Sequence, residues 1–273
     1  MTAFAELAKL PAFMRRDMRI ALSYRLAAIG GLIAVAANVL VLSLMGKLVD
    51  PARLPEYGGS RASYMEFVVI GIAVSLIVIA LVTQVATAIR NEQLIGTLES
   101  LLCTPTKVGT IQAGSAALMV LTIPLRTALY IAVLAVVFGL RFHADGILPG
   151  VVVIIAFVPF LWGLGLIAAG VILTVRRGVG ALTLAITGLG LGSGALFPLS
   201  LLPHWLARIA AENPLAITIN ALRESLIGGT GWSPIGADLL KLTVPALLAL
   251  GAGMMAFRFS LARERRKGTL GLY

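Results

Sequence analysis

Long apolar runs dominate this chain and limit what it can fold into. Six stretches are each long enough to cross a hydrocarbon core of roughly 30 Å, which takes about 20 helical residues. They cover residues 26–46, 67–89, 114–140, 147–175, 178–197 and 242–261. With 59% hydrophobic and only 12% charged residues, the composition excludes an ordinary soluble domain. The sequence therefore predicts an all-α polytopic membrane protein with six transmembrane helices in a single domain, residues 1–273.

The first apolar run has features of a signal peptide, because a basic leader precedes it and Ala34 to Ala36 resemble a cleavage site. The run continues for about ten residues beyond that point, as a membrane anchor would. We therefore interpret it as the first span.

Lys and Arg are unevenly divided between alternate loops. If there are six spans, both termini lie on one side, and the segments on that side hold 14 of the 22 basic residues, against seven in the opposite loops. The positive-inside rule places the richer side in the cytoplasm. The net charge of +10 thus reflects orientation in the membrane and does not require a nucleic-acid partner.

The segment RNEQLIGTLESLLCTP, residues 90–105, connects the second and third spans on the predicted cytoplasmic side. At 100° per residue its leucines and Ile95 share one arc, while the polar residues, with Glu92 and Glu99, share the other. This pattern predicts one amphipathic helix that Pro105 ends, with its apolar face on the spans. Helices that lie on anionic lipid usually present Lys and Arg, so the carboxylates favour a protein partner. A short interfacial or re-entrant helix with no partner is the alternative.

The same segment resembles the signature of permease subunits of type 2 ATP-binding-cassette (ABC) exporters, R-x-E-x-x-x-G-T-L-E-x-L-x-x-T-P. The matching residues are Arg90, Glu92, Gly96, Thr97, Leu98, Glu99, Leu101, Thr104 and Pro105. Two more matching segments, one upstream and one downstream, complete the family's order. YMEFVVIGI at residues 64–72 resembles the start of span 2, and NPLAITINALRESLIGG at residues 213–229 resembles the pattern before span 6.

The resemblance implies that residues 90–105 are a coupling helix that docks into a separate ABC ATPase subunit. The coupling residues would be Arg90, Glu92, Gly96, Thr97, Glu99, Thr104 and Pro105, with the carboxylates pairing with basic groups of the ATPase. It also implies a permease homodimer among membrane lipids, with ATP and Mg bound by the ATPase and no cofactor in this chain. The expected function is outward transport of an amphiphile, such as a lipid, a lipid-linked glycan or a hydrophobic drug, across a bacterial cell (inner) membrane.

The N-terminal segment, residues 1–25, has a second amphipathic pattern. After Pro11, the residues Met14, Met18, Ala21 and Leu22 fall on one arc, and Arg15, Arg16 and Arg19 fall on another. A basic polar face predicts an interfacial helix. It resembles the family's N-terminal helix, which lies along the inner leaflet beside the ATPase. A basic flank with incidental periodicity is the alternative.

Residues 198–238 are too long for a turn and too apolar for a solvated loop. They contain two helical stretches joined at Asn213 and Pro214, which we interpret as a re-entrant pair in the outer leaflet. In the family this region closes the outer end of the pathway. Asn213, Pro214, Leu222 and Arg223 are the outer gate candidates that the resemblance implies. A surface hairpin with no gating role is the alternative.

Arg126 lies near the middle of the third predicted span, where an ionisable residue is a functional candidate. It either lines the pathway and receives an anionic head group, or it pairs with a carbonyl freed beside Pro124. In the fifth predicted span, Gly188 with Gly192, and Gly190 with Gly194, are spaced for close approach of another helix.

Other functional classes find little support in the sequence. It has no Walker A motif, so it does not bind ATP through a P-loop, and two histidines and one cysteine make a metal site improbable. An ion-coupled secondary transporter, the alternative function, would need Asp, Glu or His within its spans. An intramembrane enzyme would need a nucleophile with a base. We therefore expect a transport subunit and not an enzyme.

Overall fold

The computed structural model describes residues 9–23, 29–30, 33, 37, 40–41, 44, 54–97, 100–101, 103–104, 106, 108–175 and 179–267. The predicted first span, residues 26–46, lies largely outside these described residues. The structure is almost entirely helical. Its α-helices are α2 (Leu10–Ser23), α4 (Tyr64–Ile95), α6 (Val108–Phe138), α7 (Ile147–Val175), α8 (Val179–Leu191), α9 (His204–Ala211), α10 (Pro214–Leu226) and α11 (Ser233–Lys267). Two short 3-10 helices, η2 (Ala144–Gly146) and η3 (Leu199–Leu201), connect them.

Three of these helices are long and apolar enough to cross a membrane within the described part of the chain, over Tyr64–Glu92, Ala144–Thr174 and Ile235–Glu264. Thr122–Phe138 and Leu182–Leu191 are shorter apolar helices. An all-α membrane protein is confirmed, whereas the count of six spans remains a prediction. The predicted fourth span has the bounds of α7, but α8 ends at Leu191, six residues before the predicted end of the fifth span.

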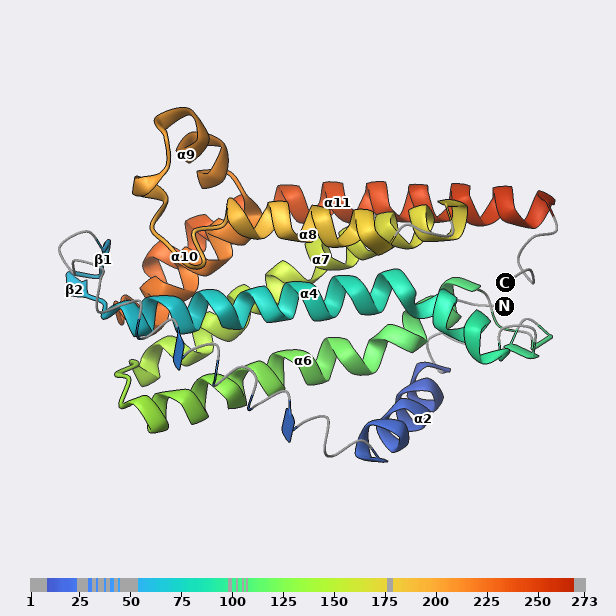
Figure 1. The fold of residues 1–273 in the computed structure, drawn as a ribbon, viewed down its shortest axis with the longest axis horizontal. Coiled ribbons are helices and arrows are strands. Elements are labelled where there is room, and N and C mark those ends of the chain that lie inside the picture. Colours follow the sequence, from blue (N-terminus) through green and yellow to red (C-terminus); the bar gives the residue numbers. More distant parts are fainter. Residues whose placement is uncertain are drawn as a thin grey trace.

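The long helices run along the longest axis of the molecule, and different small elements gather at its two ends (Figure 1). Helix α2 lies at one end, beside the end of α4 and the start of α6; we call this the α2 end. The other end, the hairpin end, carries β1 (Glu56–Tyr57), β2 (Ser60–Arg61), η2, α9 and α10.

Helix α4 is the centre of the bundle. Of its most apolar stretch 61% is buried within the chain, against 39% for α7 and 17% for α11. It packs against α6 and α7, and α7 packs in turn against α11. Ser63 and Glu66 begin α4 with reciprocal bonds: each side chain accepts from the other residue's backbone N–H, at 2.9 and 3.2 Å.

Glycine lets α7 and α11 approach closely. A Cβ on Gly163 of α7 would overlap the backbone of Ala249, and a Cβ on Gly253 of α11 would overlap the backbone of Gly163. Such contact between small residues is typical of helices that associate in lipid. Our sequence prediction placed the close approach at Gly188 and Gly190 of α8 instead. No described residue comes within 4 Å of a Cβ built on Gly188 or Gly190, so the approach of another helix there stays a prediction.

The antiparallel hairpin of β1 and β2 was not predicted. Glu56 pairs with Arg61 and Tyr57 with Ser60, around a turn of Gly58 and Gly59 whose φ angles are 55° and 76°. Two adjacent glycines with positive φ are the signal of a two-residue hairpin turn. The turn contacts Gly228: a Cβ on Gly58 would overlap the backbone of Gly228.

Candidate functional sites at the two ends of the bundle

The predicted coupling helix is broken at Gly96. Helix α4 continues through Arg90 to Ile95, and Gly96 then adopts a φ of 80°. The Thr97 N–H donates to the Glu92 carbonyl at 3.0 Å, which closes the helix in the manner of a Schellman motif. Ser100 and Leu101 are helical again, and the Leu101 N–H donates to the Thr97 carbonyl. The prediction of a single helix over residues 90–105 was therefore wrong. Glycine in the left-handed conformation ends a helix more readily than it continues one.

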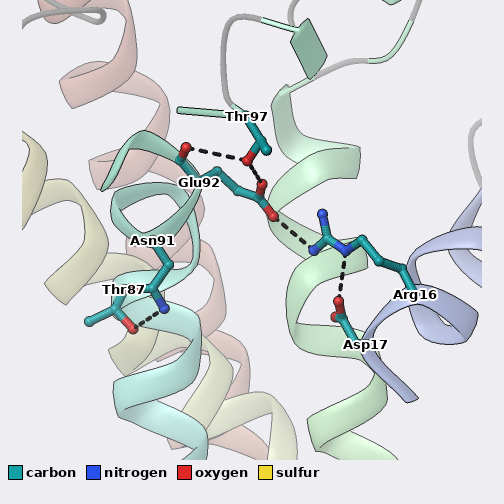
Figure 2. A network of polar contacts seen from close by, with 6 residues as sticks. All are labelled: Arg16, Asp17, Thr87, Asn91, Glu92 and Thr97. Carbon is teal, nitrogen blue, oxygen red and sulfur yellow. Dashed lines mark hydrogen bonds and ion pairs between the residues drawn. The ribbon is translucent and has the colours of Figure 1, made fainter. Parts of the chain in front are cut away.

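Glu92 is buried and faces the N-terminal helix. Its side chain is 5% exposed, and its carboxylate accepts from the Arg16 guanidinium of α2 at 2.8 Å. The Thr97 hydroxyl donates to the same carboxylate, while Asp17 binds the other side of Arg16 at 2.8 Å (Figure 2). The expectation that Glu92 points from a polar face into the cytoplasm is therefore wrong in this structure.

Helix α2, predicted from its amphipathic pattern, is confirmed, but its orientation differs from the prediction. Phe13 packs so closely on α6 that a Cβ on Gly114 would overlap its ring. Arg15 and Arg19 are exposed as predicted, whereas Arg16 is partly buried and lies 5.4 Å from the centroid of the Phe13 ring. Burial lowers the pKa of Arg16, but hydrogen bonds and charges from Asp17 and Glu92 outweigh this effect and raise it overall. The guanidinium is thus fully charged in its pair with Glu92.

Two apolar side chains are exposed at the end of α4. Leu94 and Ile95 are 62% and 72% exposed, although Leu94 was predicted to pack on the spans and Ile95 to share its apolar arc. Leu101 does pack against the core at this end, as predicted. The Thr104 hydroxyl donates to the Leu101 carbonyl at 2.6 Å. The predicted coupling residues Glu99 and Pro105 lie outside the described residues.

At the hairpin end, two helices meet at Asn213 and Pro214, as the sequence predicted. The Asn213 side chain accepts from the Leu215 N–H at 3.0 Å and so caps α10, and Pro214 takes the first helical position. The amide of Asn213 also donates to the carbonyls of Leu189 and Gly192, at 3.0 and 3.2 Å. It thereby holds the junction of α9 and α10 against the end of α8.

Arg223 of α10 is 1% exposed and lies at the centre of the hairpin end. Its guanidinium carbon is 3.3 Å from the centroid of the Phe67 ring at the start of α4, a close cation–π contact. The guanidinium donates to the Phe67 carbonyl at 2.9 and 3.2 Å, and to the carbonyls of Gly194 and Ala195 at 3.0 and 3.1 Å. Burial lowers the pKa of Arg223 to about 10, against an opposing effect of Tyr57, so the side chain is charged at neutral pH.

A cavity of about 470 Å³ lies below these contacts, between α4 and α8. Residues 192–198, which we call the connector, join α8 to η3. Ala195, Leu196 and Phe197 of the connector line the hairpin end of the cavity together with Leu215 of α10. The remaining lining is apolar except for Ser75 and Thr187. Leu222, another predicted gate residue, is buried in the core beside this region and does not line the cavity.

Arg126 lies within α6, and its side chain is outside the described part of the structure. None of the α6 residues whose side chains the structure describes lines the cavity between α4 and α8. The contact of Arg126 with an anionic head group therefore stays a prediction.

A family comparison connects the two ends. The family model described as ABC-2 type transporter matches residues 12–227. The chain belongs to the ABC-2 type transporter family. The match includes most of α2, the end of α4, the connector and α10, so both sites lie within it. No curated protein matches the sequence.

Family membership identifies this ABC-2 protein as a membrane component of a transporter, and the family in general works with an ABC ATPase. In this ABC-2 permease the sequence analysis found Glu92 and Arg223 but missed the partner of each. Arg16 was assigned to an outward basic face, although its place beside Asp17 breaks the run of positive charge. Nothing in the sequence around Phe67 indicated a cation–π contact, because Arg223 lies 156 residues further along the chain.

Proposed function

We propose that this chain is the permease subunit of an ATP-driven ABC-2 exporter that moves an amphiphile out of the cell. A separate ATPase subunit binds ATP and Mg and docks at the α2 end, which faces the cytoplasm together with both termini. Family membership supports the transport role and the ATPase partner in general. It gives no support to an ion-coupled carrier, the alternative function.

The ion pair between Arg16 and Glu92 is the observation that carries the coupling proposal. A buried charge that loses its partner is strongly destabilised, so α2 and the end of α4 are held together and move as one unit. Because Thr97 binds the same carboxylate, the turn at Gly96 belongs to this unit as well. A force applied to the segment after Gly96 therefore reaches α2 and α4 simultaneously.

The exposed apolar side chains of Leu94 and Ile95 give the ATPase a surface to pack on. The signature residues that remain candidates for polar contact are Arg90, at the end of α4, and Glu99. Within this scheme Glu92 fixes the position of the coupling segment and does not itself bind the ATPase.

The cavity between α4 and α8 is the proposed place of an apolar substrate tail. Its described lining side chains suit acyl or aromatic groups, and among them only Ser75 and Thr187 carry hydroxyls. The hairpin end then closes the pathway on the outer side. A second copy of the chain covers the open face of α8, where Leu184 is 76% exposed and no described residue comes within 4 Å of a Cβ built on Gly188.

Co-purification tests this function. A tagged chain, extracted in mild detergent from its native membrane, is expected to retain an ABC ATPase in equal amount. Reconstitution of the complex should give ATP-dependent release of a fluorescent lipid from the inner leaflet of vesicles. Arg16→Glu should abolish the release, whereas Arg15→Glu, a change at an exposed neighbour, should leave it intact. Retention of no ATPase, with movement driven by an imposed ion gradient alone, would favour the ion-coupled alternative.

A further inference from the structure

One side of α11 is apolar and exposed over most of the length of the helix. Its exposed residues, which we call the α11 stripe, are Leu240, Val244, Leu248, Met255 and Phe259. At 100° per residue, the last four fall within an arc of about 60°. From Leu240 to Phe259 the helix rises about 28 Å, close to the roughly 30 Å of a hydrocarbon core. The length of the stripe therefore fits contact with lipid.

Exposed arginines surround the stripe where α11 reaches the α2 end of the bundle (Figure 1). Arg266 continues the arc of the stripe, and Arg258 and Arg263 flank that arc on opposite sides. Among the residues that the structure describes, none of these three arginines takes part in an ion pair. Their charges are therefore available to an anion from outside the chain.

The acidic residue in this part of α11 faces away from the stripe. Residues 258–267 contain five basic residues and one acid, Glu264. Glu264 is 6% exposed and lies on the side of the helix opposite Arg266. Ser260, on the same side as Glu264, is buried, and a Cβ on Gly170 of α7 would lie 3.0 Å from its hydroxyl. The stripe thus keeps its positive charge, while the acid faces the bundle.

The opposite end of the stripe is close to neutral. Lys241, next to Leu240, is exposed, but its ammonium group pairs with the Asp238 carboxylate at 3.4 Å. The same helix face therefore carries an excess of positive charge at the α2 end and a balanced pair at the hairpin end. This asymmetry favours an anionic partner in one leaflet of the membrane.

We propose that the α2 end of the α11 stripe is a binding site for an anionic phospholipid. The phosphodiester accepts hydrogen bonds from Arg258, Arg263 and Arg266, and an acyl chain lies along Phe259 and Met255. Guanidinium groups suit this role because they present paired donors to phosphate oxygens, and basic clusters beside a span attract anionic lipid.

This lipid is a resident partner and not the transported molecule, since no described lining residue of the cavity between α4 and α8 belongs to α11. The site needs only a helix in a membrane and does not depend on the proposed transport function. In the proposed orientation it lies in the inner leaflet.

Quenching by brominated lipid tests the site in the full-length chain. Phe259→Trp places a reporter between the arginines, and the signal of Trp162, Trp205 and Trp232 is subtracted using the unchanged chain. The vesicles contain equal amounts of phosphatidylglycerol and phosphatidylcholine, with bromine on the chains of one lipid or the other. The ratio of the two quenching constants should favour phosphatidylglycerol at least about fivefold, the effect expected of one basic residue near a charged head group.

Changing the arginines separates charge from packing. The three substitutions Arg258→Gln, Arg263→Gln and Arg266→Gln together should lower the ratio to about one, because the attraction to the head group is lost. The corresponding three Lys substitutions keep the charge and should keep most of the preference. Thermal midpoints of both variants should stay close to that of the unchanged chain, since all three side chains are exposed.

The hairpin end of the same face provides the matched control. A reporter at Leu240→Trp should show a ratio near one, because Asp238 balances the charge of Lys241. Lys241→Gln should leave the ratio at Phe259→Trp unchanged. An equal preference at both reporters would overturn the proposal, since the effect would then belong to the whole bilayer.

A ratio near one at Phe259→Trp would also overturn the site, as would a preference that survives the three Gln substitutions. If inorganic phosphate abolished the preference and chloride at equal ionic strength did not, the ligand would be a soluble anion and the lipid assignment would be wrong. None of these measurements uses ATP or an ATPase subunit, so their failure leaves the proposed transport function standing.

Discussion

Glu92 and Arg223 are buried charges that the fold satisfies in different ways. Glu92 has an opposite charge on another helix, whereas Arg223 has an aromatic ring and backbone carbonyls. The two charges of a side-chain ion pair can be swapped between their positions by mutation. Backbone carbonyls cannot be changed in this way, so the position of Arg223 tolerates fewer substitutions.

Charge reversal tests the pair at the α2 end. Arg16→Glu puts two carboxylates together and should destabilise the chain by about 2 kcal/mol, less than for a fully buried pair because Arg16 is partly exposed. Adding Glu92→Arg should recover part of the lost stability and part of the ATPase rate of the complex with the ATPase subunit. The restoration is incomplete because Thr97 also binds the carboxylate. Thermal unfolding and ATPase rates of both variants measure this, and a double variant no better than Arg16→Glu would contradict the pairing.

Glu224 provides a pH dependence at the hairpin end. Burial raises the pKa of Glu224, and the charge of Asp238 raises it further. The folded chain therefore holds this proton more tightly than the unfolded chain, and stability falls as the pH rises through the interval between the two pKa values. Glu224→Gln should raise the thermal midpoint at pH 7.5, with an advantage that shrinks as the pH is lowered. A midpoint difference that grows on acidification would contradict this, and Glu212→Gln, at an exposed position, is the control.

At the scale of elements, the contact of α7 and α11 depends on the absence of side chains. Gly253→Ala should push the helices apart and cost about 1–3 kcal/mol, since its Cβ would overlap the backbone of Gly163. Gly251→Ala, on the same helix, meets no atom within 4 Å and should instead stabilise by up to about 1 kcal/mol. Thermal midpoints of the two variants in one detergent provide the comparison, and equal shifts would contradict the packing.

Local signals in the sequence predicted the elements well, and contacts between distant segments explain the errors. The bounds of α7 and the junction at Asn213 and Pro214 follow from apolar length and from the N-cap signal. The break at Gly96 had a local signal too, but amphipathic periodicity across it was given more weight. Which glycines touch another helix depends on how helices are arranged in space, and periodicity alone does not contain that information. The same holds for the partners of Glu92 and Arg223.

At the scale of the whole molecule, the two ends are predicted to face opposite sides of the membrane. Cys103, the single cysteine, is exposed at the α2 end, and Trp205 is 66% exposed on α9 at the hairpin end. In intact cells an impermeant maleimide should label Trp205→Cys, made in a Cys103→Ser background, and should spare Cys103. Inside-out vesicles should show the reverse pattern, and detergent should allow both to react. Labelling of Cys103 in intact cells would contradict a cytoplasmic α2 end.

Helix α4 carries Phe67 near one end and Glu92 near the other, with no break between them. At 1.5 Å per residue the two positions are about 38 Å apart along one rigid rod. If the α2 end faces the cytoplasm as proposed, we expect a force on that end of α4 to tilt the whole helix about its packed middle. The hairpin end would then move with it, without any chain of residue-to-residue contacts across the membrane.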